Sequence, residues 1–183
     1  VTLEQLSRAH ASGYVAELLD QMQHAFDEGA SRAIDPDTYI GNGTLSAALR
    51  SAGAAVAATD DVLSGRAVNA FCCVRPPGHH ATRSQAMGFC FFNNVCVAAR
   101  HALDVHGLQR VAIIDFDVHH GNGTEDIFSG DRKVLMVSTF QHPFYPYSGT
   151  EDPAPNMVNV PLPAGAGSRP FHEAVEEAWM PAL

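Results

Sequence analysis

The stretch IDFDVHHGNG, residues 114–123, decides how this chain is expected to fold. It continues the apolar run of residues 111–114, which predicts a buried strand that ends at the first aspartate. Asp115, Asp117 and His119 stand at alternate positions, so an extended chain would place their side chains on one face. Carboxylate and imidazole groups suit zinc, and burying them without a partner is costly. The stretch therefore predicts a metal site at a strand end.

The sequence around this stretch alternates strands with helices. Residues 67–74 and 134–139 are also apolar runs and predict two more buried strands, with helices over residues 93–105 and 124–128 between the strands. This order is typical of an α/β fold, in which a mainly parallel sheet carries helices on both faces. Sites in such sheets form where the strands end.

The N-terminal part is predicted to be helical. Thr2 and Gln5 have the spacing of a capping box, which opens a helical stretch to Asp27 with a break near Ser12–Gly13. A loop rich in Asp, Pro and Gly precedes an alanine-rich helix over residues 45–63. A further helix is expected to begin at Ser168.

Composition limits the classes of partner. The formal net charge is −9 and Lys133 is the only lysine, which argues against binding to nucleic acid. The four cysteines lack the C-x-x-C spacing of structural zinc sites and are expected to be reduced thiols in a cytoplasmic protein. No signal peptide or membrane-length apolar stretch is present, so no membrane association is expected. A length of 183 residues suits one domain.

Two more segments carry groups suited to chemistry. RPPGHH, residues 75–80, follows a predicted strand and displays two adjacent imidazoles, which could bind metal or transfer protons near neutral pH. GFCFFNN, residues 88–94, is an aromatic cluster before a helix; such clusters are mostly core, but a Phe beside Gly in a site loop could line an apolar passage.

Together these segments resemble the histone deacetylase family, including its bacterial acetylpolyamine and acetoin-utilisation relatives. The resemblance runs from about Leu6 to the C-terminus and rests on RPPGHHA, GFCFFNNV and IDFDVHHGNGTEDIF in this order. FYPYSG, residues 144–149, and VNVPL, residues 158–162, are similar to a loop and the strand after it. Tyr147 stands where that loop has its first glycine, which is expected to alter the rim of the site.

The resemblance implies a role for each matching residue. Asp117 and His119 would be two of three zinc ligands, and His79 and His80 the proton-transfer pair, with Asp115 orienting His79. Asn122 stands where some members carry Asp; because an amide raises imidazole basicity less than a carboxylate does, His80 should be easier to deprotonate here.

The resemblance also implies residues for substrate and for potassium. The substrate-binding residues would be Gly88, Phe89 and Tyr145, with Asp37 at the rim. One potassium ion would use Asp115, Asp117, His119, Ser138 and Thr139, and a second Phe128, Asp131 and Val134. The other histidines are predicted to be solvated or satisfied in the core: His24, His101 and His106 within helices, His142, His172, and His120 as a structural group.

The implied protein is a zinc-dependent deacetylase with the three-layer arginase/deacetylase-like fold. It would hydrolyse N-acetyl amides of acetyl-lysine side chains or acetylated polyamines. The family's third zinc ligand and its oxyanion-binding tyrosine have no match in the chain. Residues 1–183 are therefore expected to be a partial domain truncated at both ends and inactive by itself.

Two alternatives use the same residues. A non-catalytic fragment that binds acyl-lysine would not need to keep all five residues His79, His80, Asp115, Asp117 and His119, so their presence weighs against it. An arginase-like ureohydrolase would need a second bridging carboxylate at the position of Gly121, which has no side chain to offer.

Overall fold

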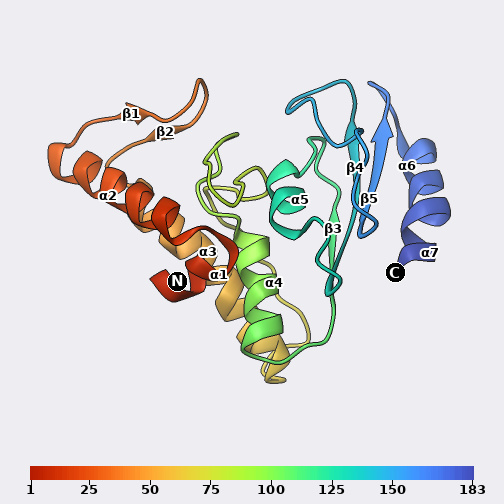
Figure 1. Ribbon diagram of the computed structural model, residues 1–183, viewed down its shortest axis with the longest axis horizontal. Coiled ribbons are helices and arrows are strands. Elements are labelled where there is room, and N and C mark those ends of the chain that lie inside the picture. The colour runs from red at the N-terminus through yellow and green to blue at the C-terminus, as the bar shows by residue number, and fades with distance from the viewer. The chain divides into compact units, whose positions relative to one another are not determined.

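The computed structural model describes residues 1–183, which form two compact units, residues 1–108 and 109–183 (Figure 1). The helices of the first unit are α1 (Leu3–Ala9), α2 (Ser12–Glu28), α3 (Thr44–Leu63) and α4 (Asn94–Asp104). Its only strands, β1 (Arg32–Ala33) and β2 (Tyr39–Ile40), form a short antiparallel pair. In the second unit the elements are β3 (Val111–Asp115), α5 (Asn122–Phe128), β4 (Val134–Gln141), β5 (Met157–Leu162), α6 (Ser168–Ala174), η1 (Val175–Trp179) and α7 (Met180–Ala182).

The helices of the first unit follow local signals. Thr2 and Gln5 form the expected capping box at the start of α1, and the chain breaks before Ser12 as predicted. Gly29 ends α2 in the left-handed conformation, with φ 62°. Of the apolar positions at helical spacing that were expected in the core, Leu6, Leu18 and Met22 are buried. Leu3 and Phe26 are not, since they are 60% and 58% exposed. The helix after Asn93 also forms, because the Asn93 side chain accepts a hydrogen bond from Cys96 N–H at its first turn.

Residues 75–93 contain no helix or ladder strand, and side chains from the surrounding helices hold them in place. The buried His10 bridges this loop: its Nδ1 lies 2.8 Å from the Thr82 carbonyl oxygen, and its Nε2 accepts from Asn93 N–H at 2.9 Å. The Tyr14 hydroxyl donates to the Phe91 carbonyl at 2.6 Å. Burial, and then the neighbouring Cys90, raise the pKa of Tyr14, so this hydroxyl keeps its proton.

Gly78 sits where the loop passes closest to α4. A Cβ at this position would lie 2.5 Å from the Asn94 nitrogen and 2.9 Å from the Phe92 carbonyl oxygen. Only glycine therefore lets the segment before the two histidines pack against the start of the helix.

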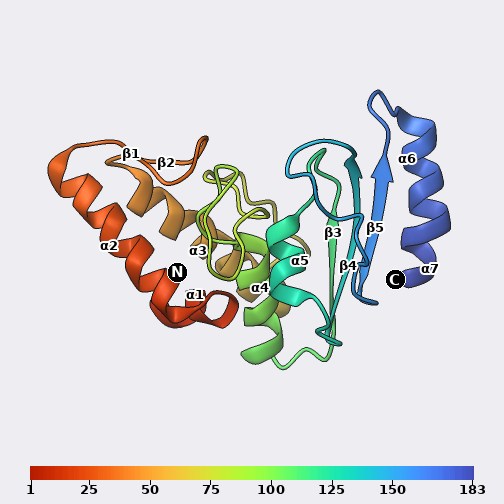
Figure 2. The same cartoon turned by 45° about the horizontal axis from the view of Figure 1, so that its top comes forward.

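The sheet of the second unit is parallel, as the alternation of strands and helices predicted. β4 lies between β3 and β5, and the register pairs Asp115 with Ser138 and Thr139 with Val160. In both views α5 lies beside the β3–β4 side of the sheet and the C-terminal helices beside β5 (Figures 1 and 2). No helix of the structure is long and apolar enough to cross a bilayer.

Two strand predictions need correction. Residues 67–74 do not form a buried strand: they pair with no other segment, and Val68 and Phe71 are 95% and 92% exposed. A strand exists only through its hydrogen-bonded neighbour, so an apolar run without one stays irregular. β3 forms as predicted but is only partly buried, because it is an edge strand; Ile114 is 49% exposed.

Replacing His10 by Phe should lower the free energy of unfolding by about 2–4 kcal/mol. Phe keeps the volume of the ring but leaves the Thr82 carbonyl and the Asn93 N–H buried without partners. Urea unfolding followed by circular dichroism measures the change. His24→Phe, at an exposed position on α2, is the control and should shift stability by less than about 0.5 kcal/mol. Equal stabilities of the two variants would contradict an anchoring role for His10.

Candidate active site

A turn after β3, and not strand alternation, brings Asp117 and His119 together. The strand ends at Asp115, and residues 117–119 bend away from the extended conformation. Asp115 Oδ1 accepts a hydrogen bond from Asp117 N–H at 3.1 Å, and Asp117 Oδ1 accepts one from His119 N–H at 2.8 Å. Each carboxylate thus fixes the backbone two residues further on, as in an Asx turn. The expectation of one continuous strand face is wrong beyond Asp115.

Asp117 and His119 face each other through side-chain atoms of the kinds that can bind a metal ion. Asp117 Oδ1 lies 3.0 Å from His119 Nδ1, and the two side chains are 50% and 34% exposed. Two ligands of a tetrahedral zinc at ~2.0–2.1 Å lie about 3.3 Å apart. The spacing and the donor types therefore fit two of the ligands of a zinc ion.

Aromatic rings hold the His119 imidazole. Phe144 stacks on it with ring centroids 5.1 Å apart and planes 10° apart, and Tyr145 meets it edge-on at 6.0 Å. Next to Asp117, a hollow of about 240 Å³ opens at the carboxyl ends of the strands, and Thr139 and Leu162 also line it. This is where sites form in parallel sheets.

His120 is packed behind this turn. Its ring is 1% exposed, and its Nε2 contacts the Glu125 carboxylate, whose pKa is lowered chiefly by this hydrogen bond. A Cβ on Gly149 would come within 2.7 Å of the ring, so the chain passes directly over it. Asn159 Nδ2 donates to both Glu125 and Gly149. These contacts support the structural role predicted for His120.

The histidine pair lies in the first unit, on the anchored loop. The rings of His79 and His80 are 4.1 Å apart between centroids and inclined by 44°. His80 is 4% exposed, whereas His79 is half-buried. The close packing of Gly78 and the hydrogen bond from Asn93 Nδ2 to the Ala81 carbonyl fix the backbone on both sides of the pair.

Phe89 lines a second hollow, of about 490 Å³, in the first unit. Asp37, Arg75 and Pro76 are among the other residues around it. Phe89 is 51% exposed and has φ 66°; its N–H donates to Thr38 Oγ1 at 3.0 Å, and that hydroxyl donates to Asp37. The structure thus brings together Asp37 and Phe89, which the resemblance placed on the substrate side, and the Gly88 carbonyl accepts from Cys90 Sγ.

The groups expected to bind potassium occupy two places in the second unit. Ser138 pairs with Asp115 in the ladder, so both lie at the same end of the sheet as Thr139. The carbonyl oxygens of Phe128, Asp131 and Val134 converge: each lies 2.8–3.1 Å from Asn156 Nδ2. The three carbonyl oxygens therefore do lie together, and in this structure they accept hydrogen bonds from the side-chain amide of Asn156.

Sequence reasoning missed two polar arrangements. His10, which anchors the loop, was not predicted to have a role, because its two partners lie far away in sequence and leave no local pattern around it. His101 and His106, predicted as helical and without a role, both contact Asp60, and His106 lies beyond the end of α4. These contacts join α3 to the end of α4, which lies far away in sequence, so no sequence motif predicts them.

Comparison with known proteins gives one consistent family. The model of the histone deacetylase domain matches residues 1–183. A histone deacetylase-like amidohydrolase of Pseudomonas aeruginosa is 42% identical over 98% of this chain and 48% of its own length. A probable deacetylase of Archaeoglobus fulgidus is 36% identical over the whole chain and half of its own length.

A solved structure agrees. The crystal structure of the HDA15 HD domain matches with a TM-score of 0.90 and 35% identity, over all of this chain and 53% of that one. The α/β fold expected from the sequence is thereby confirmed. The chain spans about half the length of the relatives it matches.

Tyr147→Gly should stabilise the protein by about 0.5–1 kcal/mol. Tyr147 is 73% exposed and has φ 63°, a conformation that strains a side chain and that glycine adopts freely. This φ also explains a glycine at the matching position of the resembling loop. Thermal unfolding measures the change, with Tyr147→Ala as the control that retains the strain. A gain in the alanine variant as large as in the glycine variant would contradict the explanation by φ.

Proposed function

Because the chain belongs to the histone deacetylase family, we propose that it forms part of a zinc-dependent amidohydrolase that removes acetyl groups from acetyl-lysine or acetylated polyamines. The observation that carries the proposal is the 3.0 Å approach of Asp117 Oδ1 and His119 Nδ1 at the end of a parallel strand. Both the donor types and the spacing suit zinc. The family model and the deacetylases among the relatives support the reaction class.

Asp117 and His119 are the proposed zinc ligands in this chain. Zinc bound there would polarise the acetyl carbonyl and lower the pKa of a bound water. A catalytic zinc takes three protein ligands, and the motifs of this chain supply two. The third ligand and a tyrosine for the oxyanion are proposed to come from sequence outside these 183 residues, which by themselves should not hydrolyse the amide.

His79 and His80 are the proposed proton-transfer pair. A neutral imidazole accepts a proton at its unprotonated ring nitrogen and can return it to the leaving amine. The nearly complete burial of His80 keeps its ring in one orientation, which proton transfer requires. Asp115 and Asn122 are proposed to orient the two rings.

Phe89 and Tyr145 are the proposed walls of the acyl-amine passage. The exposed ring of Phe89 borders the larger hollow, and Tyr145 lies edge-on to His119. Apolar walls admit an uncharged acylated amine and disfavour an ammonium group, whose desolvation is costly. Asp37 is proposed to hold the substrate at the rim. Potassium is proposed at the oxygen groups described above, and a cytoplasmic location remains a prediction.

The test uses a protein that contains these 183 residues and spans the full length of the relatives, called the extended protein below. It should release acetate from acetyl-lysine peptides or acetylpolyamines, and chelation followed by zinc should remove and restore this activity. The 183 residues alone serve as the comparison. Urea release from arginine that depends on manganese would overturn the proposal in favour of the arginase-like reaction.

Asp117→Ala and His119→Ala should each remove most of the bound zinc and nearly all activity from the extended protein. Each change deletes one of two neighbouring ligands. Metal analysis after dialysis measures occupancy. Asp126→Asn, a substitution on α5 outside the motif's ligand positions, is the control and should keep its zinc. Full zinc occupancy in both ligand variants would refute the assignment.

His80→Ala should leave zinc bound and lower kcat by about 10²-fold or more. The imidazole is proposed to move a proton and not to hold the metal. Steady-state rates together with metal content separate these roles. Loss of zinc from this variant would place His80 among the ligands instead.

A further inference from the structure

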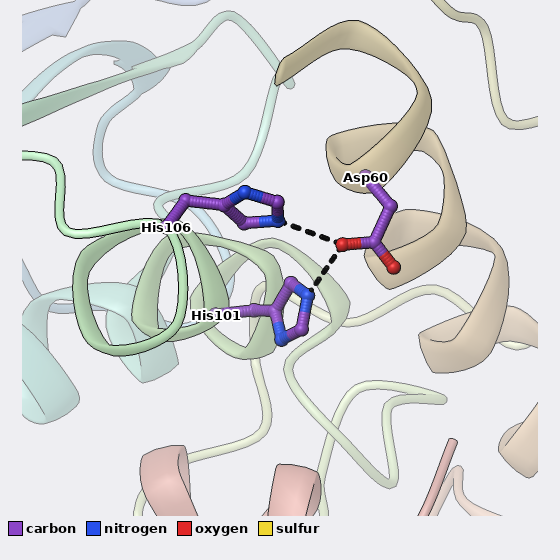
Figure 3. Close-up of side chains that lie close together, drawn as sticks. All are labelled: Asp60, His101 and His106. Carbon is purple, nitrogen blue, oxygen red and sulfur yellow. Dashed lines mark hydrogen bonds and ion pairs between the residues drawn. The ribbon is translucent and has the colours of Figure 1, made fainter. Parts of the chain in front are cut away.

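Asp60, His101 and His106 form a cluster in the first unit that the deacetylase reaction does not use (Figure 3). Both imidazoles direct Nε2 at the same atom, Asp60 Oδ1, at 2.8 Å from His101 and 2.7 Å from His106. The three ligand atoms lie within 4.8 Å of one another. The other carboxylate oxygen of Asp60 points away from both rings (Figure 3).

The end of α4 brings the two histidines together. Five residues apart, they would lie about 140° apart around a regular helix. Here the helix ends at Asp104, Gly107 takes φ 71°, and Leu108 N–H bonds back to the Ala102 carbonyl. This closing turn carries the His106 ring to the side of His101, and the ring centroids are 5.3 Å apart.

We propose that Asp60, His101 and His106 bind one divalent transition-metal ion, with Zn²⁺ as the first candidate. Two imidazoles and one carboxylate are a ligand set that such ions prefer, and three protein ligands leave a position for water. The His101 side chain is 6% exposed and therefore fixed, while those of His106 and Asp60 are 24% and 41% exposed. The ion can thus reach the site from solvent and meet ligands that are already oriented.

Arg8 opposes metal binding through the tautomer of His101. Its Nη1 lies 3.1 Å from His101 Nδ1, and a guanidinium can only donate. Nδ1 must therefore accept, which puts the ring proton on Nε2, where the metal would bind. When metal binds, that proton moves to Nδ1 and faces Arg8, so Arg8 must withdraw. Arg8 would keep a partner after withdrawing, because its Nη2 also donates to Glu4 Oε1 at 2.7 Å.

This opposition makes the affinity of the site depend on Arg8. Arg8→Met keeps much of the apolar stem but removes both the charge and the donor, so it should tighten zinc binding at the cluster about tenfold or more. A cluster that serves only as a hydrogen-bond network would not show this gain.

Zinc titration of the metal-free extended protein against a chromophoric chelator tests the proposal. The wild type should bind one equivalent more than Asp60→Asn or His106→Asn. Asp60→Asn is the sharper variant, because the amide oxygen still accepts from both rings but lacks the carboxylate charge. His24→Asn is the matched control: its imidazole lies 3.4 Å from a single carboxylate oxygen of Asp20 and should contribute no site.

Ring ¹⁵N resonances of the histidines give a readout that is independent of folding defects. Without metal, His101 should show the Nε2–H tautomer; with zinc, the Nε2 signals of His101 and His106 should shift together and saturate at that additional equivalent. Equal zinc stoichiometry in the wild type and both ligand variants would overturn the proposal. So would His101 and His106 resonances that stay unchanged at saturating zinc.

Discussion

The parallel pairing of β3 with β4 determines where the proposed metal ligands stand. Parallel strands end at the same edge of a sheet, so the register that pairs Asp115 with Ser138 also puts the turn after Asp115 beside the end of β4. The carboxylates then shape that turn by accepting backbone N–H groups two residues ahead. The orientation of Asp117 toward His119 thus depends on the hydrogen bonds of this turn, and these in turn require that β3 ends at Asp115.

A comparable constraint acts in the first unit through buried imidazoles. His10 lies between a carbonyl and an N–H, so only the tautomer with its proton on Nδ1 satisfies both. His101 lies between a guanidinium and a carboxylate, which selects the opposite tautomer. The same side chain is thereby a fixed anchor at His10, whereas at His101 it is a proposed metal ligand whose proton would have to move between the two ring nitrogens. The groups around each ring determine which nitrogen carries the proton, since the imidazole itself is the same in both places.

Helices were predicted more accurately than strands, and the difference is physical. The capping box at Thr2, the break at Ser12 and the helix after Asn93 depend on contacts within a few residues, which the sequence displays. A strand needs a neighbour from elsewhere in the chain. Residues 134–141 have such neighbours on both sides, while residues 67–74 have none and remain exposed although they are also mostly apolar.

The sequence by itself determined the family and the parallel α/β arrangement, because both are carried by short motifs whose order is specific. The chemical roles of individual residues remain predictions from the same motifs. Only the tertiary structure showed that Asp117 and His119 meet through a turn, that Tyr147 occupies a conformation suited to glycine, and that His10 holds the loop of the histidine pair. It alone joined Asp60 to His101 and His106. These features arise from groups that lie far apart in the chain, or from backbone angles, and neither leaves a local pattern in the sequence.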